Sequence, residues 1–274
     1  MRLAAFVHAA KIQFGREREA FWLAYNAART PPAPSGRNEF AELDAALAVD
    51  GLDLQRLVRR AQFGIGQPQR EAQARQDIAT ALGLDPGHPV ALVLRARLRF
   101  REGAFAEALA DAEAALLRAP RSVEALFQRA RALEARGQGA AALKAYDDVL
   151  AVAPANHAAL LNRGQLLQRS RQFQRALGDF DAALRIDRSD ADGWLSRAGI
   201  RVALGEPEAA IADYREALAL APNRIDVALG LTQALVSAEQ PSLAIDELGR
   251  LITRYPEQAG FWNMRCLIRA VSGQ

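Results

Sequence analysis

Apolar residues recur along residues 87–256 at the three- and four-residue spacing that one face of a helix requires. The pattern breaks twice in every 34 residues, once near the middle and once at the end. The middle break carries Gly103, Gly137 and Gly205, and glycine tolerates the left-handed conformation that ends a helix. The closing break carries proline, which disfavours helix in the residue before it. Each unit is therefore predicted to be two antiparallel helices joined by a short turn.

The closing prolines follow a fixed period. They stand at positions 86, 120, 154, 222 and 256, so every step is 34 residues or twice that, and Arg188 occupies the one position without proline. A fixed period of this length is typical of an array built from one repeated unit. A unit of two helices cannot bury its apolar face alone, so neighbouring units must stack. The sequence predicts an all-α solenoid of antiparallel helix pairs, with five clear units over residues 87–256.

Small and bulky residues occupy fixed places within the units. One position of the first helix holds Ala96, Ala130, Gly164 and Ala198, one position of the second holds Ala108, Ala142, Ala176, Ala210 and Ala244, and a bulky position of the second holds Tyr146, Phe180, Tyr214 and Leu248. Small residues allow close approach of two helices, and the bulky residues fill the space between them. These positions are the predicted core.

This spacing resembles the tetratricopeptide repeat family, whose pattern runs from an aromatic residue through alanine, a second aromatic and another alanine to a closing proline. The unit that matches best carries Trp194, Ala198, Ala210, Tyr214, Ala217 and Pro222. The resemblance holds over five consecutive units, with departures at Ala112 and Arg188 and with arginine at the leucine position of the first four units. It implies a right-handed superhelical solenoid that binds proteins or peptides.

The N-terminal segments continue the 34-residue pattern less regularly. Residues 55–86 are predicted to be a degenerate repeat, whose first helix is cut short by the glycines and proline within residues 64–68. Residues 1–54 are predicted to form N-terminal helices of an earlier degenerate repeat. The expected helices are residues 2–14, 16–29 and 37–50, with a turn over residues 31–36.

Residues 257–274 suffice for one helix, which allows two interpretations. In the first interpretation the helix caps the array, because arrays need a terminal element with a polar outer face. Alternatively, it is the first helix of a truncated repeat, because Trp262, Arg265, Cys266 and Gly273 stand at repeat positions. Under the second interpretation the apolar face of this helix packs against a further helix of a longer parent protein or against a second chain. In the second case the chain self-associates through this helix.

Arginines recur with the same period. They stand at positions 95, 129, 163, 197 and 265, and Leu231 occupies the remaining place in the row. Three of them have an aspartate sixteen residues later, on the second helix of the same unit. We interpret Arg95–Asp111, Arg163–Asp179 and Arg197–Asp213 as structural ion pairs between the two helices or between adjacent units. A phosphate-binding stripe is the alternative, but the paired acids and a net charge of only +3 disfavour nucleic acid as a partner.

The resemblance also implies a binding face, because the first helices of the family line a concave groove. The corresponding residues form an apolar row of Val93, Phe127, Leu161, Leu195 and Leu229, a more polar row that includes Arg97, Arg131, Gln165 and Gln233, and two further charges at Arg101 and Arg169. Such a groove favours an extended peptide or protein segment with apolar anchors and some acidic residues. The alternative is that packing covers part of the apolar row and that the arginines are solvated surface.

Composition narrows the remaining function classes. A single cysteine excludes an internal disulfide framework, and no run of 18 apolar residues predicts a membrane span. The first residues lack a clear signal-peptide cleavage site, so we expect a cytoplasmic protein, or a periplasmic one if the chain is a fragment of an exported parent. The three histidines are scattered, and the sequence lacks a glycine-rich phosphate loop, a GxSxG motif and an HExxH motif. We therefore expect no metal, no cofactor and no catalytic residue.

The sequence thus predicts a non-catalytic protein–protein interaction scaffold. The alternative is a recruitment or regulatory repeat module of a larger bacterial enzyme.

Overall fold

The computed structural model describes residues 39–49 and 51–273 of the chain. The helices predicted at 2–14 and 16–29 and the turn predicted at 31–36 lie outside the described residues. The described residues divide into two compact units, of which one ends at Thr80 and the other begins at Ala81. All regular secondary structure in these residues is helical, so this part of the chain is all-α, as predicted.

The first unit holds α3 (Glu39–Val49), α4 (Leu54–Gly64) and most of α5 (Glu71–Leu84). The Asp53 carboxylate caps α4 by accepting hydrogen bonds from the backbone N–H groups of Gln55 and Arg56 at 3.0 and 3.1 Å. The helix ends at Gly64, where an added Cβ would come within 2.9 Å of the Ala74 side chain on α5. Close contact between α4 and α5 therefore requires glycine at this point.

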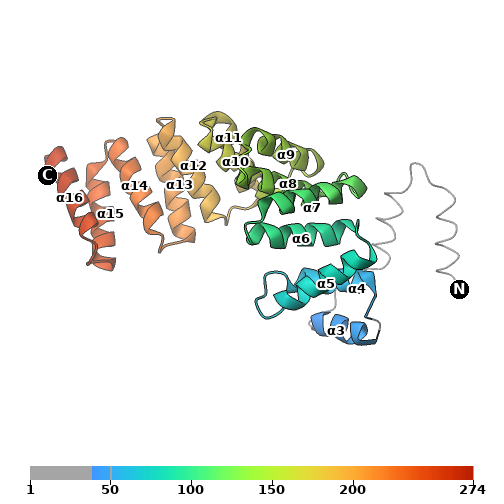
Figure 1. The fold of residues 1–274 in the computed structure, drawn as a ribbon. Helices are drawn as coiled ribbons and strands as arrows, with labels where there is room; N and C mark the ends of the chain where they lie inside the picture. The colour runs from blue at the N-terminus through green and yellow to red at the C-terminus, as the bar shows by residue number, and fades with distance from the viewer. Residues whose placement is uncertain (1–38, 50, 274) are drawn as a thin grey trace. The chain divides into compact units, whose positions relative to one another are not determined.

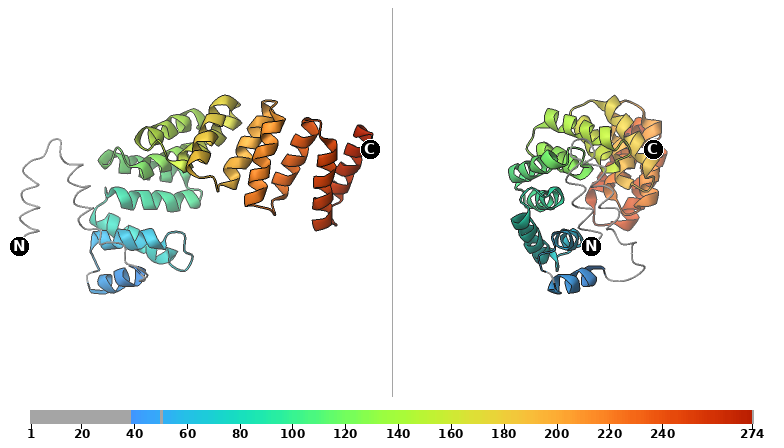
Figure 2. Two further views of the ribbon diagram at one scale, coloured as in Figure 1. Left: turned by 180° about the vertical axis from the view of Figure 1, so that it is seen from behind. Right: turned by 90° about the vertical axis from the view of Figure 1, so that its right-hand side faces the viewer.

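The second unit continues with helices that follow one another in chain order, and each lies beside the next (Figures 1 and 2). The five pairs are α6 (Pro89–Arg101) with α7 (Phe105–Arg118), α8 (Val123–Ala135) with α9 (Gly139–Val152), α10 (His157–Arg169) with α11 (Phe173–Ile186), α12 (Ala191–Ala203) with α13 (Pro207–Leu220), and α14 (Ile225–Ser237) with α15 (Pro241–Arg254). A single helix, α16 (Ala259–Ser272), follows the fifth pair. Stacked pairs of this kind form a solenoid.

The turn inside each pair contains one residue in the left-handed conformation. The φ angle is +79° at Gly103, +73° at Gly137 and +77° at Gly205. Arg171 and Glu239 occupy the same place in the third and fifth pairs, with φ angles of +56° and +57°. The repeat thus imposes a left-handed residue even where the side chain disfavours it.

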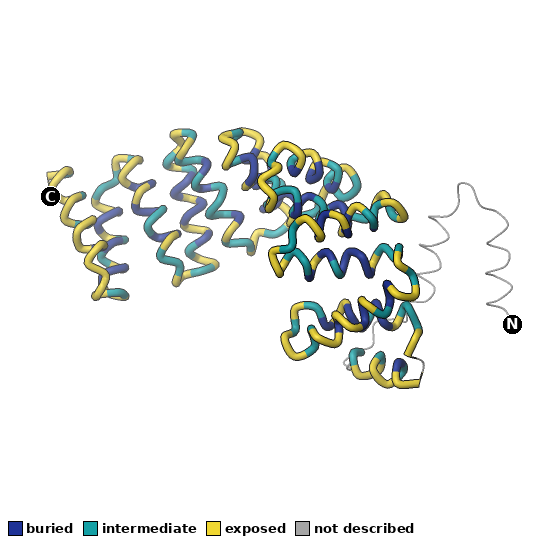
Figure 3. The backbone as a smooth tube through the Cα atoms, viewed as in Figure 1, coloured by how far each residue is buried: buried dark blue, intermediate teal, exposed yellow. Residues whose placement is uncertain are grey.

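The predicted small and bulky positions form the core of the second unit. Ala96, Ala130 and Ala198 are 0% exposed, as is the bulky Phe180. Gly164 takes the place of alanine on α10, where an added Cβ would lie 3.0 Å from the Phe180 ring. Figure 3 shows buried residues recurring along each helix from α6 to α15, whereas α16 is mostly exposed.

Side-chain caps begin the first helices of the first four pairs, and they were not among the predicted features. His88, Ser122, Asn156 and Asp190 each accept a hydrogen bond from the backbone N–H three residues later. These caps stand 34 residues apart, so a helix-capping residue is one more position of the repeat pattern.

Candidate peptide-binding face and its supporting ion pairs

Three arginines of the first helices each contact the aspartate sixteen residues later. The pairs are Arg95–Asp111 between α6 and α7, Arg163–Asp179 between α10 and α11, and Arg197–Asp213 between α12 and α13. In each, the arginine Nε and Nη2 donate to the two carboxylate oxygens at 2.6 to 2.9 Å. The three aspartates are buried. This bidentate geometry holds the two helices of a pair in one register.

Two of these arginines also contact the second helix of the preceding pair. Arg163 donates from Nη1 to Asp147 on α9 at 2.5 Å, and Arg197 donates from Nη1 to Asp181 on α11 at 2.7 Å. Both aspartates stand sixteen residues before their arginine, and both are partly exposed. Each arginine therefore joins the second helices on either side of its own helix.

The first unit contains the same arrangement. Arg60 on α4 donates to both carboxylate oxygens of Asp77 on α5, at 2.8 and 2.6 Å, and it also contacts Asp44 on α3. The arginine was not among the predicted residues, because it stands 35 residues before Arg95, one more than the period. Asp77 stands 34 residues before Asp111 and was the signal that could have revealed the pair.

These contacts keep the arginines charged. The hydrogen bond to Asp179 raises the pKa of Arg163 above its ordinary value. Burial lowers the pKa of Arg197, but the hydrogen bonds and charges of Asp213 and Asp181 raise it overall. A phosphate group would have to displace buried carboxylates to reach these guanidinium groups, so the geometry favours a structural role for them.

Arg129 is an exception within the row. Ala145 stands sixteen residues after it, and Arg129 instead contacts the partly exposed Asp148 on α9.

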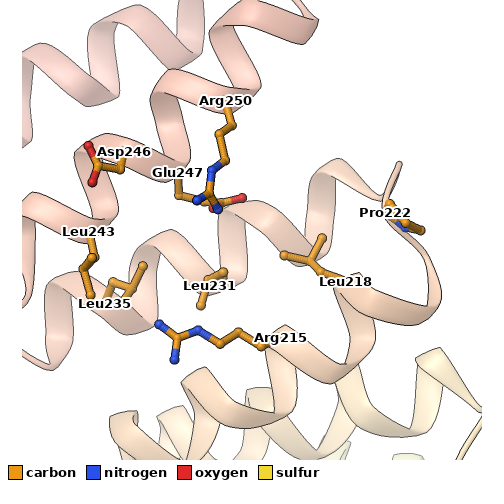
Figure 4. A pocket seen from close by; sticks show the side chains of 9 residues that line it. All are labelled: Arg215, Leu218, Pro222, Leu231, Leu235, Leu243, Asp246, Glu247 and Arg250. Atoms are coloured by element: carbon orange, nitrogen blue, oxygen red, sulfur yellow. The ribbon is translucent and has the colours of Figure 1, made fainter.

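A pocket of ≈ 350 Å³ lies where Leu231 replaces the arginine of the row on α14. Leucines from three helices supply its apolar part, and charged side chains surround it (Figure 4). The lining residues are Arg215, Leu218, Pro222, Leu231, Leu235, Leu243, Asp246, Glu247 and Arg250. Glu247, which stands sixteen residues after Leu231, pairs with Arg250 at 2.8 Å. The missing guanidinium thus leaves an apolar hollow with a polar rim between α13, α14 and α15.

The predicted apolar row is half-buried along most of its length. Phe127, Leu161, Leu195 and Leu229 each pack against a core cluster and keep part of the side chain accessible. Packing therefore holds these four side chains in place without covering them.

Val93 does not fit the predicted row. It is only 5% exposed, because the neighbouring residues of α6 from Ala91 to Leu94 are all buried and this part of the helix is enclosed on every side. Val93 therefore belongs to the core and offers too little accessible surface to contact a peptide.

Two of the predicted arginines are held by contacts within the face. The Arg131 guanidinium lies 4.0 Å from the centroid of Phe100 and 5.8 Å from that of Phe127, which are cation–π distances. Arg169 pairs with Glu134, which also accepts a hydrogen bond from the Tyr146 hydroxyl.

Burial, and then the hydrogen bond to Glu134, raises the pKa of Tyr146. The Tyr146 hydroxyl therefore stays protonated and continues to donate to Glu134. The other predicted polar residues of this face are all exposed: Arg97, Arg101, Gln165 and Gln233.

The described residues place no group of three histidine, cysteine, aspartate or glutamate side chains where it could hold a metal ion. None of the helices in residues 39–49 and 51–273 is long and apolar enough to cross a membrane.

Several solved structures share this fold. MamA from Desulfovibrio magneticus RS-1 is 20% identical, with a TM-score of 0.58 over 62% of this chain and 97% of that one. TTC0263, a thermophilic TPR protein from Thermus thermophilus, is 23% identical, with a TM-score of 0.52 over 67% and 99%. YrrB, described as a TPR protein with an unusual peptide-binding site, is 17% identical, with a TM-score of 0.53 over 68% and 95%. At these identities the likeness concerns the fold.

Family models described as tetratricopeptide repeat match the sequence in overlapping stretches. One matches residues 93–157, 127–168 and 161–225, and a second matches residues 201–265. A comparison with curated proteins found no match. Because the repeat matches run from residue 93 to residue 265 and the fold is shared with solved TPR structures, the chain belongs to the tetratricopeptide repeat family and is a helical scaffold for protein interaction.

Proposed function

We propose that the chain binds an extended segment of another protein along the face of its first helices, and that it acts as an adaptor without catalysis of its own. The half-buried row of Phe127, Leu161, Leu195 and Leu229 carries this proposal. Each side chain is fixed by the core on one side and accessible on the other. Apolar side chains held in this way accept the anchors of a peptide at little further cost in side-chain entropy.

The charges of the face suggest the chemistry of the partner. Arg97 is exposed on α6, and Arg131 lies on α8 with its guanidinium stacked on Phe100. The charge of Arg169 is already met by Glu134, so the positive character is strongest on α6 and α8. We infer a segment whose apolar residues contact the row and whose acidic residues lie toward its α6 end.

The family fold supports this proposal. YrrB, which shares the fold, is described as having a peptide-binding site. Extended segments bind well to repeat arrays because the repeats present similar contacts at regular intervals.

A peptide-display selection on the wild-type chain tests the proposal. We expect the selected peptides to combine spaced apolar residues with acidic ones. The best peptide should bind the Leu161→Gln variant about tenfold or more weakly, because a central apolar contact becomes polar. Arg97→Gln should weaken binding by a few-fold, chiefly at low salt, because Arg97 is exposed to solvent. Fluorescence anisotropy measures both affinities.

Leu117→Gln is the matched control, because Leu117 is 85% exposed on the second helix α7. It should leave the affinity unchanged, and circular dichroism should show the same helicity in all variants. Equal binding of the selected peptides to wild type and Leu161→Gln would refute the proposed face.

A further inference from the structure

One face of α16 lies uncovered in the part of the chain that the structure describes. Trp262, Arg265, Cys266 and Arg269 share this face, because they are spaced three and four residues apart on one helix. Trp262 is 43% exposed and Cys266 is also exposed. The residues at the position of Cys266 in earlier first helices are all buried, namely Ala96, Ala130, Gly164, Ala198 and Thr232. The second helix of the pair, which follows each earlier first helix, does not follow α16 within the described residues.

The face of α12 carries nearly the same side chains. Trp194, Arg197, Ala198 and Arg201 stand 68 residues before Trp262, Arg265, Cys266 and Arg269. On α12 this face is covered by α13, whose Asp213 contacts both arginines. The structure therefore shows, on α12, how the same side chains contact a helix that carries an aspartate.

The two faces are also arranged alike. The Trp194 indole N–H donates to the Arg188 carbonyl at 2.9 Å, and the Trp262 N–H donates to the Pro256 carbonyl at 3.2 Å. In each helix the following arginine lies 4.7 Å from the tryptophan ring centroid. The indole and guanidinium of α16 are thus already oriented as they are on α12, where a helix covers them.

Within the described residues, α16 lacks the covering helix and, with it, the carboxylate that would contact Arg265. The Nε atom of Arg265 is buried and has no hydrogen-bond partner among the described residues. Sixteen residues before Arg265 stands Gly249, which has no side chain to offer, whereas Arg197 has Asp181 at the equivalent place. A buried guanidinium N–H without an acceptor is costly, and an incoming carboxylate would satisfy it.

We propose that this face of α16 is a docking site for an amphipathic helix of a partner protein that carries an aspartate or glutamate. The partner helix matches the pattern of α13, in which Asp213 contacts Arg197 of α12 and Ala210, Tyr214 and Ala217 share a core cluster with Ala198 of α12. Its acid contacts Arg265 and Arg269, and its small residues allow close approach to Trp262. A second copy of α16 is a poor occupant, because a symmetric contact would bring four arginines together.

Cys266 provides the assay, because it is the only cysteine of the chain and lies on the proposed face. The probe is an end-capped peptide of residues 207–220, the sequence of α13, and its matched control carries Asp213→Asn. Isolated helices of this length are marginal, so the peptides are used in excess. We expect the aspartate peptide to slow maleimide labelling of Cys266 in a saturable way. The half-effect concentration of the asparagine peptide should be at least about tenfold higher, because a hydrogen bond between charged groups is lost.

Variants of the chain complete the experiment. Arg265→Gln should abolish the protection, whereas Arg121→Gln, which removes an exposed arginine outside the face, should leave it unchanged. Equal protection by both peptides, or none by either, overturns the proposal. So does slower labelling at higher concentrations of the chain alone with dimers in sedimentation, because the occupant would then be a second copy.

Discussion

Arg197 and Asp213 form a bidentate ion pair, with 2.9 Å between Nε and Oδ2 and 2.7 Å between Nη2 and Oδ1. The Asp213 side chain is 2% exposed, so its charge is compensated by arginine and not by water. The same guanidinium contacts Asp181, whose side chain is 38% exposed. Arg197 therefore contacts one buried and one partly exposed carboxylate, so the effect of burial on an ion pair can be measured at a single arginine.

Asp213→Asn should lower the free energy of unfolding by about 3 kcal/mol, because it removes the buried carboxylate that Arg197 and Arg201 share and leaves Arg197 only the partly exposed Asp181. Asp181→Asn should cost only about 0–1 kcal/mol, because water and salt screen the partly exposed Asp181 carboxylate and Arg197 keeps its pair with Asp213. Urea denaturation followed by circular dichroism compares the two. Equal losses would show that burial does not decide the contribution of these pairs.

Ala145 allows the converse test. It is 2% exposed and stands sixteen residues after Arg129, where the pairs α6–α7, α10–α11 and α12–α13 carry a buried aspartate. Ala145→Asp should be tolerated with a loss of no more than about 1–2 kcal/mol, because Arg129 can turn from Asp148 to the new carboxylate.

The matched control is Ala142→Asp, at a residue that is 0% exposed on the same helix and lies outside the aspartate row. This change should cost about 4 kcal/mol or more, because it buries a charge without a partner. Thermal unfolding of the two variants gives the comparison. If Ala145→Asp lowers the melting temperature as much as Ala142→Asp does, Arg129 does not pair with a carboxylate at residue 145.

Replacement of Arg171 by glycine should stabilise the folded protein. The Arg171 φ angle of +56° costs a residue with a side chain about 1–2 kcal/mol, and glycine adopts this conformation freely. Glycine also gains freedom in the unfolded chain, which offsets part of the benefit. We expect Arg171→Gly to stabilise the protein by about 0.5–1 kcal/mol.

Gly137 serves as the reference for this change, because it holds the same turn position with a φ angle of +73°. Gly137→Ala should destabilise by about 1 kcal/mol. Differential scanning calorimetry measures both shifts in melting temperature. A lower melting temperature for Arg171→Gly would mean that the arginine side chain contributes more than the backbone strain removes.

The 34-residue period was enough to predict which residues occupy the same position in successive repeats. It was not enough to predict how far the side chain of each is exposed. It placed Arg163 opposite Asp179, because both residues keep the spacing of sixteen on two helices of one pair. It did not predict the contact of Arg163 with Asp147, because that aspartate belongs to the preceding pair, and stacking of pairs determines which side chains meet. Val93 shows the same limit. It shares a repeat position with the half-buried Phe127, yet it is enclosed because its surroundings differ.

His88 should make the stability of the second unit depend on pH. Its Nδ1 accepts a hydrogen bond from the Ala91 N–H at 3.3 Å and caps α6, so the folded state needs the neutral imidazole. Burial lowers the pKa of His88, with a smaller opposing effect of Asp85 and a small lowering by Arg118.

Because the pKa of folded His88 lies below the ordinary value of 6.5, the unfolded chain takes up the proton first as the pH falls. The contribution of the cap is thus fully present above about pH 6.5 and is lost progressively as the pH falls toward the folded pKa. His88→Asn keeps an acceptor at the cap and removes the titration. We expect the melting temperature of the wild type to fall more than that of His88→Asn between pH 7.5 and pH 5, since the other titrating groups are common to both proteins. Parallel curves for the two proteins would show that protonation of His88 is not coupled to folding.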